Sequence, residues 1–312
     1  MGEIGGDTNT FGVTGISPNS NLRAVSVFRG TNTSNYNPAE AIRQAADVLR
    51  AGDILLLEQH MPGPNHPGDD TQFGYIAIEW WQHLFLAIQY ATSKGVIVIE
   101  AAGNGSQNLD AAVYNTRPAG FPTWWTNPFR RMGAMDCGAI IVGAGAPPTG
   151  TNGGNWGPAR SRLGFSNYGN CVDCQGWGNG VTTTGYGDVT GTNPANQNEW
   201  YTHFFSGTSS ASPIVTGAVA CLQGIQRAAR RPILTPSRMR QLLRSTGTAQ
   251  QASTTAPITQ RIGNQPNLRQ LVQQVVGAPK WCGVQFTGRC WLFKTKRGLP
   301  TAGRMYGRWS GR

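Results

Sequence analysis

The sequence has few cysteines, few acidic residues and no long hydrophobic run. Six cysteines in 312 residues are too few for a disulfide scaffold, and the lone pair Cys171-Val-Asp-Cys174 favours a local disulfide or two free thiols over a zinc site. No stretch of about 18 uninterrupted apolar residues occurs, so we expect no membrane span. Only 15 acidic residues oppose 26 lysines and arginines, which gives a net charge of +11.

This positive charge is concentrated near the C-terminal end. Residues 277–312 contain eight Lys or Arg and no Asp or Glu, which leaves a net charge of +3 for the rest of the chain. The basicity therefore belongs mainly to one segment, and nucleic acid is not an expected partner of the protein as a whole. We predict a folded domain over residues 1–276 and a basic, aromatic-containing tail over residues 277–312 that is disordered or loosely attached.

Short apolar runs alternate with helical patterns along the first half of the chain. We predict strands at residues 22–27, 53–57, 96–99 and 139–142, and helices at residues 37–50, 75–94, 207–229, 235–244 and 267–276. Residues 147–202 are rich in Gly, Asn and Thr, which favours surface loops and short antiparallel pieces. The alternation predicts an α/β fold with a mostly parallel sheet, and ligands bind such sheets at the carboxyl ends of the strands.

A serine lies at the start of the longest predicted helix, in the segment Gly207-Thr-Ser-Ser-Ala-Ser-Pro213. The N-terminus of a helix offers unpaired backbone N–H groups and a partial positive charge, so Ser209 is placed where an oxyanion would be stabilised as it forms. An ordinary Ser/Thr helix cap is the alternative interpretation of this segment.

A second segment, Val96-Ile-Val-Ile-Glu-Ala-Ala-Gly-Asn-Gly105, places an asparagine directly after a predicted buried strand. The side-chain amide of Asn104 could donate to the negative oxygen of a tetrahedral acyl intermediate. On its own, Gly-Asn-Gly is more typical of a simple turn.

Taken together and in this order, the two segments resemble those of the subtilisin-like serine peptidases, the subtilases. The serine segment is similar to the family's nucleophile motif, Gly-Thr-Ser-x-Ala-x-Pro, and Phe165-Ser-Asn-Tyr-Gly169 is a weaker match. The resemblance covers residues 1–276 and implies a subtilisin-like three-layer α/β/α fold. It also implies peptide hydrolysis through an acyl-enzyme on Ser209, with Asn104 in the oxyanion hole and no required cofactor.

The same resemblance assigns a substrate-binding role to two short segments. Glu58, Gln59 and His60 lie where the family pairs an extended polypeptide substrate, and Ala102 and Gly103 would line the same cleft. The family usually has small Ser- and Gly-rich sequence at residues 58–60, so the cleavage preference of this chain stays open.

The catalytic Asp and His of the family have no match in this sequence. In subtilases the order is Asp, His, Ser, with Gly-Thr after the histidine, and none of the four histidines, His60, His66, His83 and His203, has that context. The first seven residues resemble the stretch just after the catalytic His. We therefore expect that the N-terminal strands, the Asp and the His are missing, and that the chain alone is marginally folded with unpaired strand edges. The alternative is a catalytically inactive relative that retains a peptide-binding cleft.

Two further expectations come from the resemblance alone. Residues 7–13 lie where many subtilases carry a calcium loop, which would make Asn9 a side-chain ligand of a structural calcium ion, with a plain Asx turn as the alternative. The family also implies secretion, whereas the oligomeric state is not indicated by the sequence.

Overall fold

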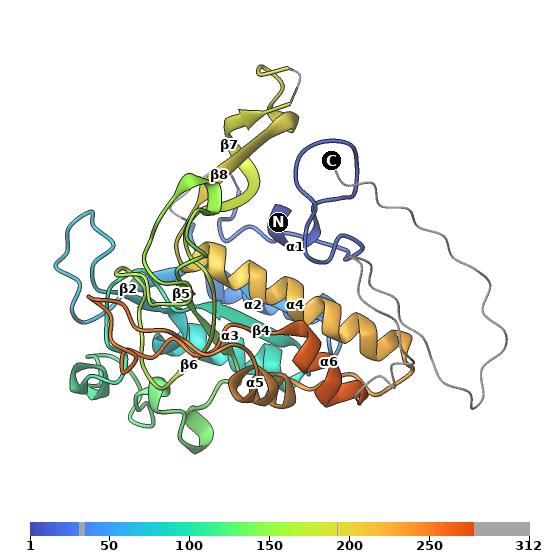
Figure 1. Cartoon of the computed structure of the whole chain (residues 1–312). Helices are drawn as coiled ribbons and strands as arrows, with labels where there is room; N and C mark the ends of the chain where they lie inside the picture. The colour runs from blue at the N-terminus through green and yellow to red at the C-terminus, as the bar shows by residue number, and fades with distance from the viewer. Residues whose placement is uncertain (31–34, 192, 278–312) are drawn as a thin grey trace.

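The computed structural model of the chain describes residues 1–30, 35–191 and 193–277, and it is built around a parallel four-stranded sheet (Figure 1). The strand order is β1-β4-β5-β6. The four strands are β1 (Ile54–Leu57), β4 (Ile97–Ala101), β5 (Ile140–Gly145) and β6 (Val172–Trp177). Three of them lie where apolar runs predicted strands. The predicted tail lies outside the described residues, apart from Gly277.

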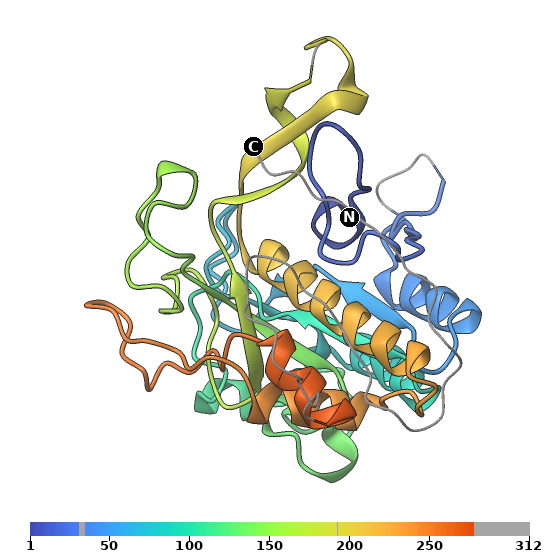
Figure 2. The ribbon, with the colours of Figure 1, turned by 45° about the vertical axis from the view of Figure 1, so that its right-hand side comes forward.

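Helices cover both faces of this sheet, which gives three layers (Figure 2). One face packs against α2 (Pro38–Val48) and α3 (Gln82–Ser93). The other packs against α4 (Thr208–Ala228), α5 (Pro236–Ser245) and α6 (Leu268–Val276). Side chains of β4 alternate between the two cores, with Val98 in the first and Ile97 and Ile99 in the second. The predicted α/β fold with a parallel sheet is confirmed.

Local capping signals explain where the predicted helices begin. The Asn37 side chain accepts the backbone N–H of Glu40 at 3.1 Å, and Pro38 occupies the first position of α2. Thr235 caps α5 in the same way, at 3.3 Å from the backbone nitrogen of Arg238. Because these signals lie within four residues of one another, the sequence alone was sufficient to place the starts of α2 and α5.

Two of the predicted elements are wrong. Residues 22–27 form no strand, and Val25 is 44% exposed, because no strand among the described residues pairs with this segment. The helix predicted from Tyr75 begins seven residues later. Its first part forms β3 (Tyr75–Ala77), which pairs antiparallel with β2 (His60–Pro62), and the 3₁₀ helix η1 (Ile78–Trp80).

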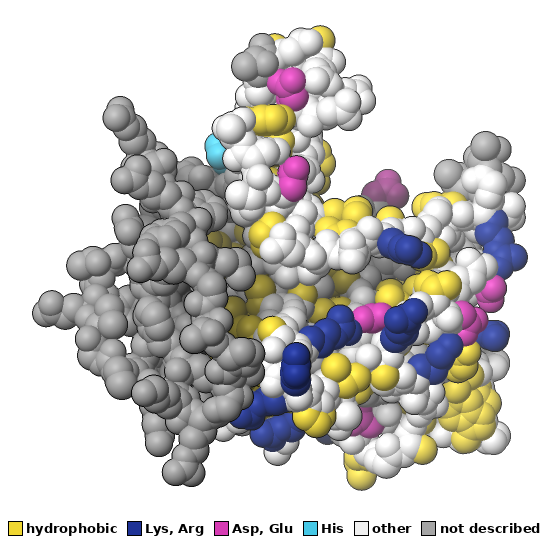
Figure 3. Space-filling view, turned by 90° about the vertical axis from the view of Figure 1, so that its right-hand side faces the viewer, with side chains coloured by type: hydrophobic (Ala, Val, Ile, Leu, Met, Phe, Trp, Pro, Cys, Tyr) yellow, Lys and Arg dark blue, Asp and Glu magenta, His cyan; other side chains and the backbone are white. Residues whose placement is uncertain are grey.

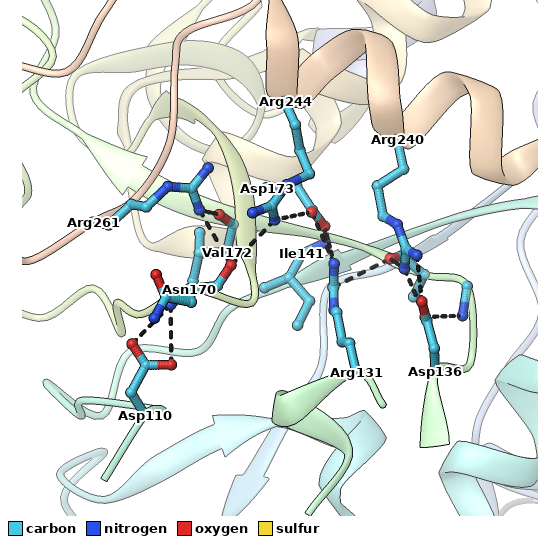
Figure 4. Close-up of polar contacts among 12 residues, drawn as sticks. Asp110, Arg131, Asp136, Ile141, Asn170, Val172, Asp173, Arg240, Arg244 and Arg261 are labelled. Atoms are coloured by element: carbon cyan, nitrogen blue, oxygen red, sulfur yellow. Dashed lines mark hydrogen bonds and ion pairs between the residues drawn. The ribbon is translucent and has the colours of Figure 1, made fainter. Parts of the chain in front are cut away.

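The strand β6 was missed because its sequence is polar at alternate positions. Asp173 is fully buried, yet it forms ion pairs with Arg131 at 2.8 Å and Arg244 at 2.7 Å (Figure 4). Cys171, just before this strand, and Cys174, within it, are buried free thiols. The sequence pattern could not show that these polar groups would find partners in the interior.

The remaining elements are short or peripheral. The antiparallel hairpin β7 (Val181–Thr190) and β8 (Trp200–Phe205) projects from the body, in agreement with the antiparallel pieces predicted there (Figures 1 and 3). Helix α1 (Gly2–Gly5) packs beside α4. Five 3₁₀ helices complete the described chain: η2 (Ala112–Asn115), η3 (Pro128–Arg130), η4 (Gly133–Met135), η5 (Thr151–Gly153) and η6 (Gln197–Glu199). No helix within the described ranges has the length and apolarity needed to cross a membrane.

Candidate active site

The carboxyl ends of β1 and β4 meet the N-terminus of α4. The Ser209 hydroxyl, in the first turn of α4, donates to the carbonyl oxygen of Glu58 at 3.2 Å, one residue after β1. The backbone N–H of Gly103, two residues after β4, donates to the Thr208 hydroxyl oxygen at 3.2 Å. The fold thus brings together three segments that the sequence placed at strand ends and at a helix start.

The side chain of Asn104 is fixed by contacts at both ends of its amide. Its Oδ1 accepts the backbone N–H of Thr208 at 2.8 Å and the Thr208 hydroxyl at 2.9 Å, and its Nδ2 donates to Oε1 of Gln72 at 3.1 Å. The Nδ2 also lies beside the start of α4, because a Cβ on Gly207 would be 3.0 Å from it. Asn104 and Ser209 are therefore held on neighbouring segments, and one of the two N–H bonds of the Asn104 amide is used by Gln72.

The turn that carries Asn104 is held by a buried asparagine that the sequence analysis did not assign to the site. Asn167 donates from Nδ2 to the carbonyl oxygens of Ala102 at 2.7 Å and Tyr75 at 2.8 Å. Gly103 has a φ of +94°, and a Cβ there would lie 2.7 Å from this same Nδ2, so the turn requires glycine. The only sequence signal for Asn167 was its place in the segment Phe165–Gly169.

His60 contacts the candidate oxyanion residue directly. Its Nδ1 accepts the backbone N–H of Asn104 at 3.1 Å, and its ring lies against the ring of Tyr75 with 4.7 Å between centroids. Burial lowers the pKa of the His60 imidazole below its ordinary value, which favours the neutral ring that this hydrogen bond needs. The sequence placed His60 in the cleft but gave no sign of the contact with Asn104.

No described histidine is hydrogen-bonded to the Ser209 hydroxyl. His66 is bonded to the carbonyl oxygen of Phe73 at 2.9 Å, and His203 to the Thr182 hydroxyl at 3.0 Å. A serine hydroxyl needs a base to accept its proton when it attacks a carbonyl. Among the described residues, no imidazole is hydrogen-bonded to the Ser209 hydroxyl, which donates to a backbone carbonyl instead.

Comparison with known proteins identifies the family. A sequence model described as the subtilase family matches residues 2–270. The chain belongs to the subtilase family. An alkaline proteinase of Hapsidospora chrysogena is 29% identical over 228 residues, which cover 72% of this chain and 42% of that protein. An extracellular serine proteinase of Thermus sp. strain Rt41A is 34% identical over 134 residues, or 43% of this chain and 23% of that protein. The chain thus spans less than half the length of these relatives.

Solved structures support the subtilase fold. The self-cleaved protease domain of PatA has a TM-score of 0.57 at 18% identity, over 88% of this chain and 81% of that one. Fervidolysin from Fervidobacterium pennivorans has a TM-score of 0.54 at 22% identity, over 87% of this chain and 35% of that one. At these identities the similarity concerns the fold alone.

A second carboxyl group lies near Glu58 in this subtilase. Glu3, on α1, is 7% exposed, and its Oε2 has no hydrogen-bond partner. Burial, together with the nearby carboxylate of Glu58, raises the pKa of the Glu3 carboxyl to about 9. The Glu3 carboxyl is therefore protonated near neutral pH. Burial also raises the pKa of the Glu58 carboxyl.

The segment at residues 7–13 has the geometry of an Asx turn. Asn9 accepts the backbone N–H of Phe11 through Oδ1 at 3.0 Å, and its Nδ2 donates to Oδ1 of Asp7 at 3.2 Å. Across the residues described, no group of three or more His, Cys, Asp or Glu side chains could hold a metal ion. The Asn9 side chain is thus engaged within its own turn, and the calcium role of Asn9 stays a prediction.

Proposed function

We propose that this chain carries the nucleophile and the oxyanion donors of a serine endopeptidase that acts on polypeptides. The observation behind this proposal is the placement of Ser209 in the first turn of α4, beside the turn that carries Asn104. Family membership supports the same reaction class, because subtilases are serine peptidases. Polypeptide is accordingly the substrate class that we propose.

In the proposed reaction, Ser209 Oγ attacks the carbonyl carbon of the scissile peptide. A carbon–oxygen bond forms, the carbon–nitrogen bond breaks, and the hydroxyl proton passes through a base to the leaving amine. Water then hydrolyses the acyl-enzyme. The Asn104 amide and the Ser209 backbone N–H donate to the developing oxyanion, and in subtilisin the loss of one such side-chain donor costs about 2.7–4 kcal/mol.

The substrate would lie as an extended strand between the two segments that flank Ser209. Residues Glu58, Gln59 and His60 follow β1, and residues Ala102 and Gly103 follow the neighbouring strand β4. Backbone groups of both segments would pair with the peptide on either side, as in strand addition to a sheet edge. Side chains at residues 58–60 would then contribute to the cleavage preference.

The base and its orienting carboxylate are not supplied by any described residue in contact with Ser209. We propose that an Asp and a His outside this sequence complete the triad. The same observation favours a second candidate, a catalytically inactive subtilase whose cleft binds peptides without cleaving them. The two candidates differ in whether the Ser209 hydroxyl reacts.

Labelling with a fluorophosphonate probe, mapped by mass spectrometry, separates the two candidates. The proteins to compare are this chain and a version extended by the in-frame sequence upstream of Met1 in the parent gene, each with Ser209→Ala and with Ser210→Ala as the matched neighbour. Labelling of the extended protein that is lost only in Ser209→Ala supports the peptidase. Absence of labelling in both forms, with retained peptide binding, supports the inactive relative.

Secretion belongs to the same proposal. The Thermus relative is named an extracellular serine proteinase, and the relative from Hapsidospora chrysogena an alkaline proteinase. Detection of the protein in the culture medium of its source organism, with an intracellular protein as control, would test this part.

A further inference from the structure

The backbone of Asn104 is anchored by the ring of His60 rather than by another backbone group. The acceptor is Nδ1, at 3.1 Å from the Asn104 nitrogen, so the ring proton of neutral His60 must reside on Nε2. The ring is half-buried and lies against Tyr75, which limits its freedom to turn away. His60 thereby helps to determine where the amide of Asn104 points.

We propose that His60 is a positioning residue that couples the oxyanion donor to pH. This inference rests on the proposed function, because it assumes that Asn104 stabilises an oxyanion. The neutral ring accepts the Asn104 N–H and holds the turn in place. The protonated ring carries N–H groups on both nitrogens and accepts nothing, so protonation breaks the anchor and leaves a backbone donor without its partner.

The surroundings of His60 favour the neutral form at neutral pH. The facing turn, residues 102–105, contains no charged side chain. The titratable groups nearby are Tyr75, in contact with the ring, Glu58 on the preceding segment, and His66 on the other side of Tyr75. Because burial lowers the pKa of His60, the anchor is present above that pKa and is lost as the pH falls through it.

The side chain of Asn104 does not depend on the same contact. Thr208 holds its oxygen and Gln72 its nitrogen, whereas His60 holds only its backbone. We therefore expect protonation of His60 to shift the Asn104 amide group while its oxygen stays bonded to Thr208. The measurable result is weaker binding of a tetrahedral anion at low pH, by roughly 10-fold for the loss of one such hydrogen bond.

A peptide boronic acid tests this coupling, because it forms a tetrahedral anionic adduct with a serine hydroxyl at equilibrium. Its affinity is measured from pH 5 to 8 for the parent chain, His60→Asn, His60→Phe and the control His66→Asn. Asparagine retains an acceptor oxygen near the position of Nδ1 but does not titrate. Adduct formation releases the hydroxyl proton, so every protein shares one common loss of affinity as the pH falls. Beyond that common slope we expect a further decrease at low pH for the parent and for His66→Asn, no further decrease for His60→Asn, and weak binding with no further decrease for His60→Phe.

Nitrogen-15 NMR of the unbound chain provides a readout that does not depend on the proposed function. An Nε2–H tautomer at pH 7, with an Asn104 amide signal that shifts as His60 titrates, supports the inference. An Nδ1–H tautomer, or a boronate profile that is unchanged in His60→Asn, would overturn it. Absence of boronate binding in every protein at every pH would instead contradict the proposed function, while the NMR result still decides the role of His60.

Discussion

Beyond the candidate site, two buried glutamates dominate the residue-scale electrostatics. Glu100, on β4, accepts the backbone N–H of Glu79 at 2.9 Å, and Glu79 accepts the thiol of Cys137 at 2.9 Å. Burial raises the pKa of both carboxyl groups. Oε2 of Glu100 has no partner. These carboxyl groups therefore remain protonated in the folded protein at a pH where the unfolded chain releases the protons.

The substitution Glu100→Gln is expected to stabilise the chain at alkaline pH. For a carboxyl group with a raised folded-state pKa, the stabilising contribution is full below the unfolded value of about 4.5 and is lost as the pH rises through the folded value. The slope of the free energy of unfolding against pH reaches about 1.4 kcal/mol per pH unit for one such group. Urea unfolding between pH 5 and 9 measures this slope. Asp70→Asn, on an exposed loop, should leave the slope unchanged, and an equally steep slope in Glu100→Gln would refute this assignment.

At the scale of elements, β6 depends on its ion pairs as much as on apolar packing. The Asp173 carboxylate accepts hydrogen bonds from Nη1 of Arg131 and from the backbone N–H of Ile141, so it links β6 to the neighbouring strand β5 (Figure 4). Arg244 brings α5 to the same carboxylate. Removal of this one charge would leave the Arg131 guanidinium, 12% exposed, buried without its counterion.

Asp173→Asn is expected to lower the free energy of unfolding by about 3–5 kcal/mol, the usual cost of breaking a buried ion pair. The matched control is Arg227→Ala, which removes an exposed pair with Asp53 and should cost less than about 1 kcal/mol. Chemical denaturation of both variants measures the difference. Equal losses in the two would contradict the structural role given to Asp173.

The same element shows why the sequence predicted some parts of the fold and not others. Apolar runs identified β1, β4 and β5, and local caps at Asn37 and Thr235 identified α2 and α5. β6 was missed because the partners that neutralise Asp173 lie 42 and 71 residues away in the chain.

The candidate site likewise contains residues that local motifs indicated and residues that only the structure revealed. Motif order selected Ser209 and Asn104 as candidates, and the fold brings their segments together. The contact of His60 with Asn104 joins residues 44 apart, and the contact of Asn167 with Ala102 joins residues 65 apart. No local pattern reports such long-range contacts, so these supporting residues became visible only in the structure.

At the scale of the whole molecule, β1 is an edge strand of the described sheet. It pairs with β4 on one side, and no described strand pairs with its other side. Its residues Ile54, Leu55 and Leu56 are only partly buried. Unpaired backbone groups beside apolar side chains provide a template for pairing with another chain.

This chain is therefore expected to self-associate as its concentration rises, and Leu55→Lys is expected to weaken the association. Sedimentation velocity over a range of concentrations measures it. Val48→Lys, which removes an apolar side chain that is 68% exposed on α2 but away from the edge, is the control and should have little effect. A parent chain that stays monomeric at all concentrations would show that the edge is protected.

The measurement that most directly tests the central claim, that Ser209 and Asn104 act together in acyl transfer, is the rate at which a fluorophosphonate labels Ser209. It should be made in whichever form of the protein labels faster, the chain described here or its extended version. Ser209→Ala should abolish labelling, and Asn104→Ala should slow it by roughly 10²–10³-fold, the range found when one oxyanion donor is removed. Labelling at another residue, or a rate unchanged in Asn104→Ala, would contradict the account.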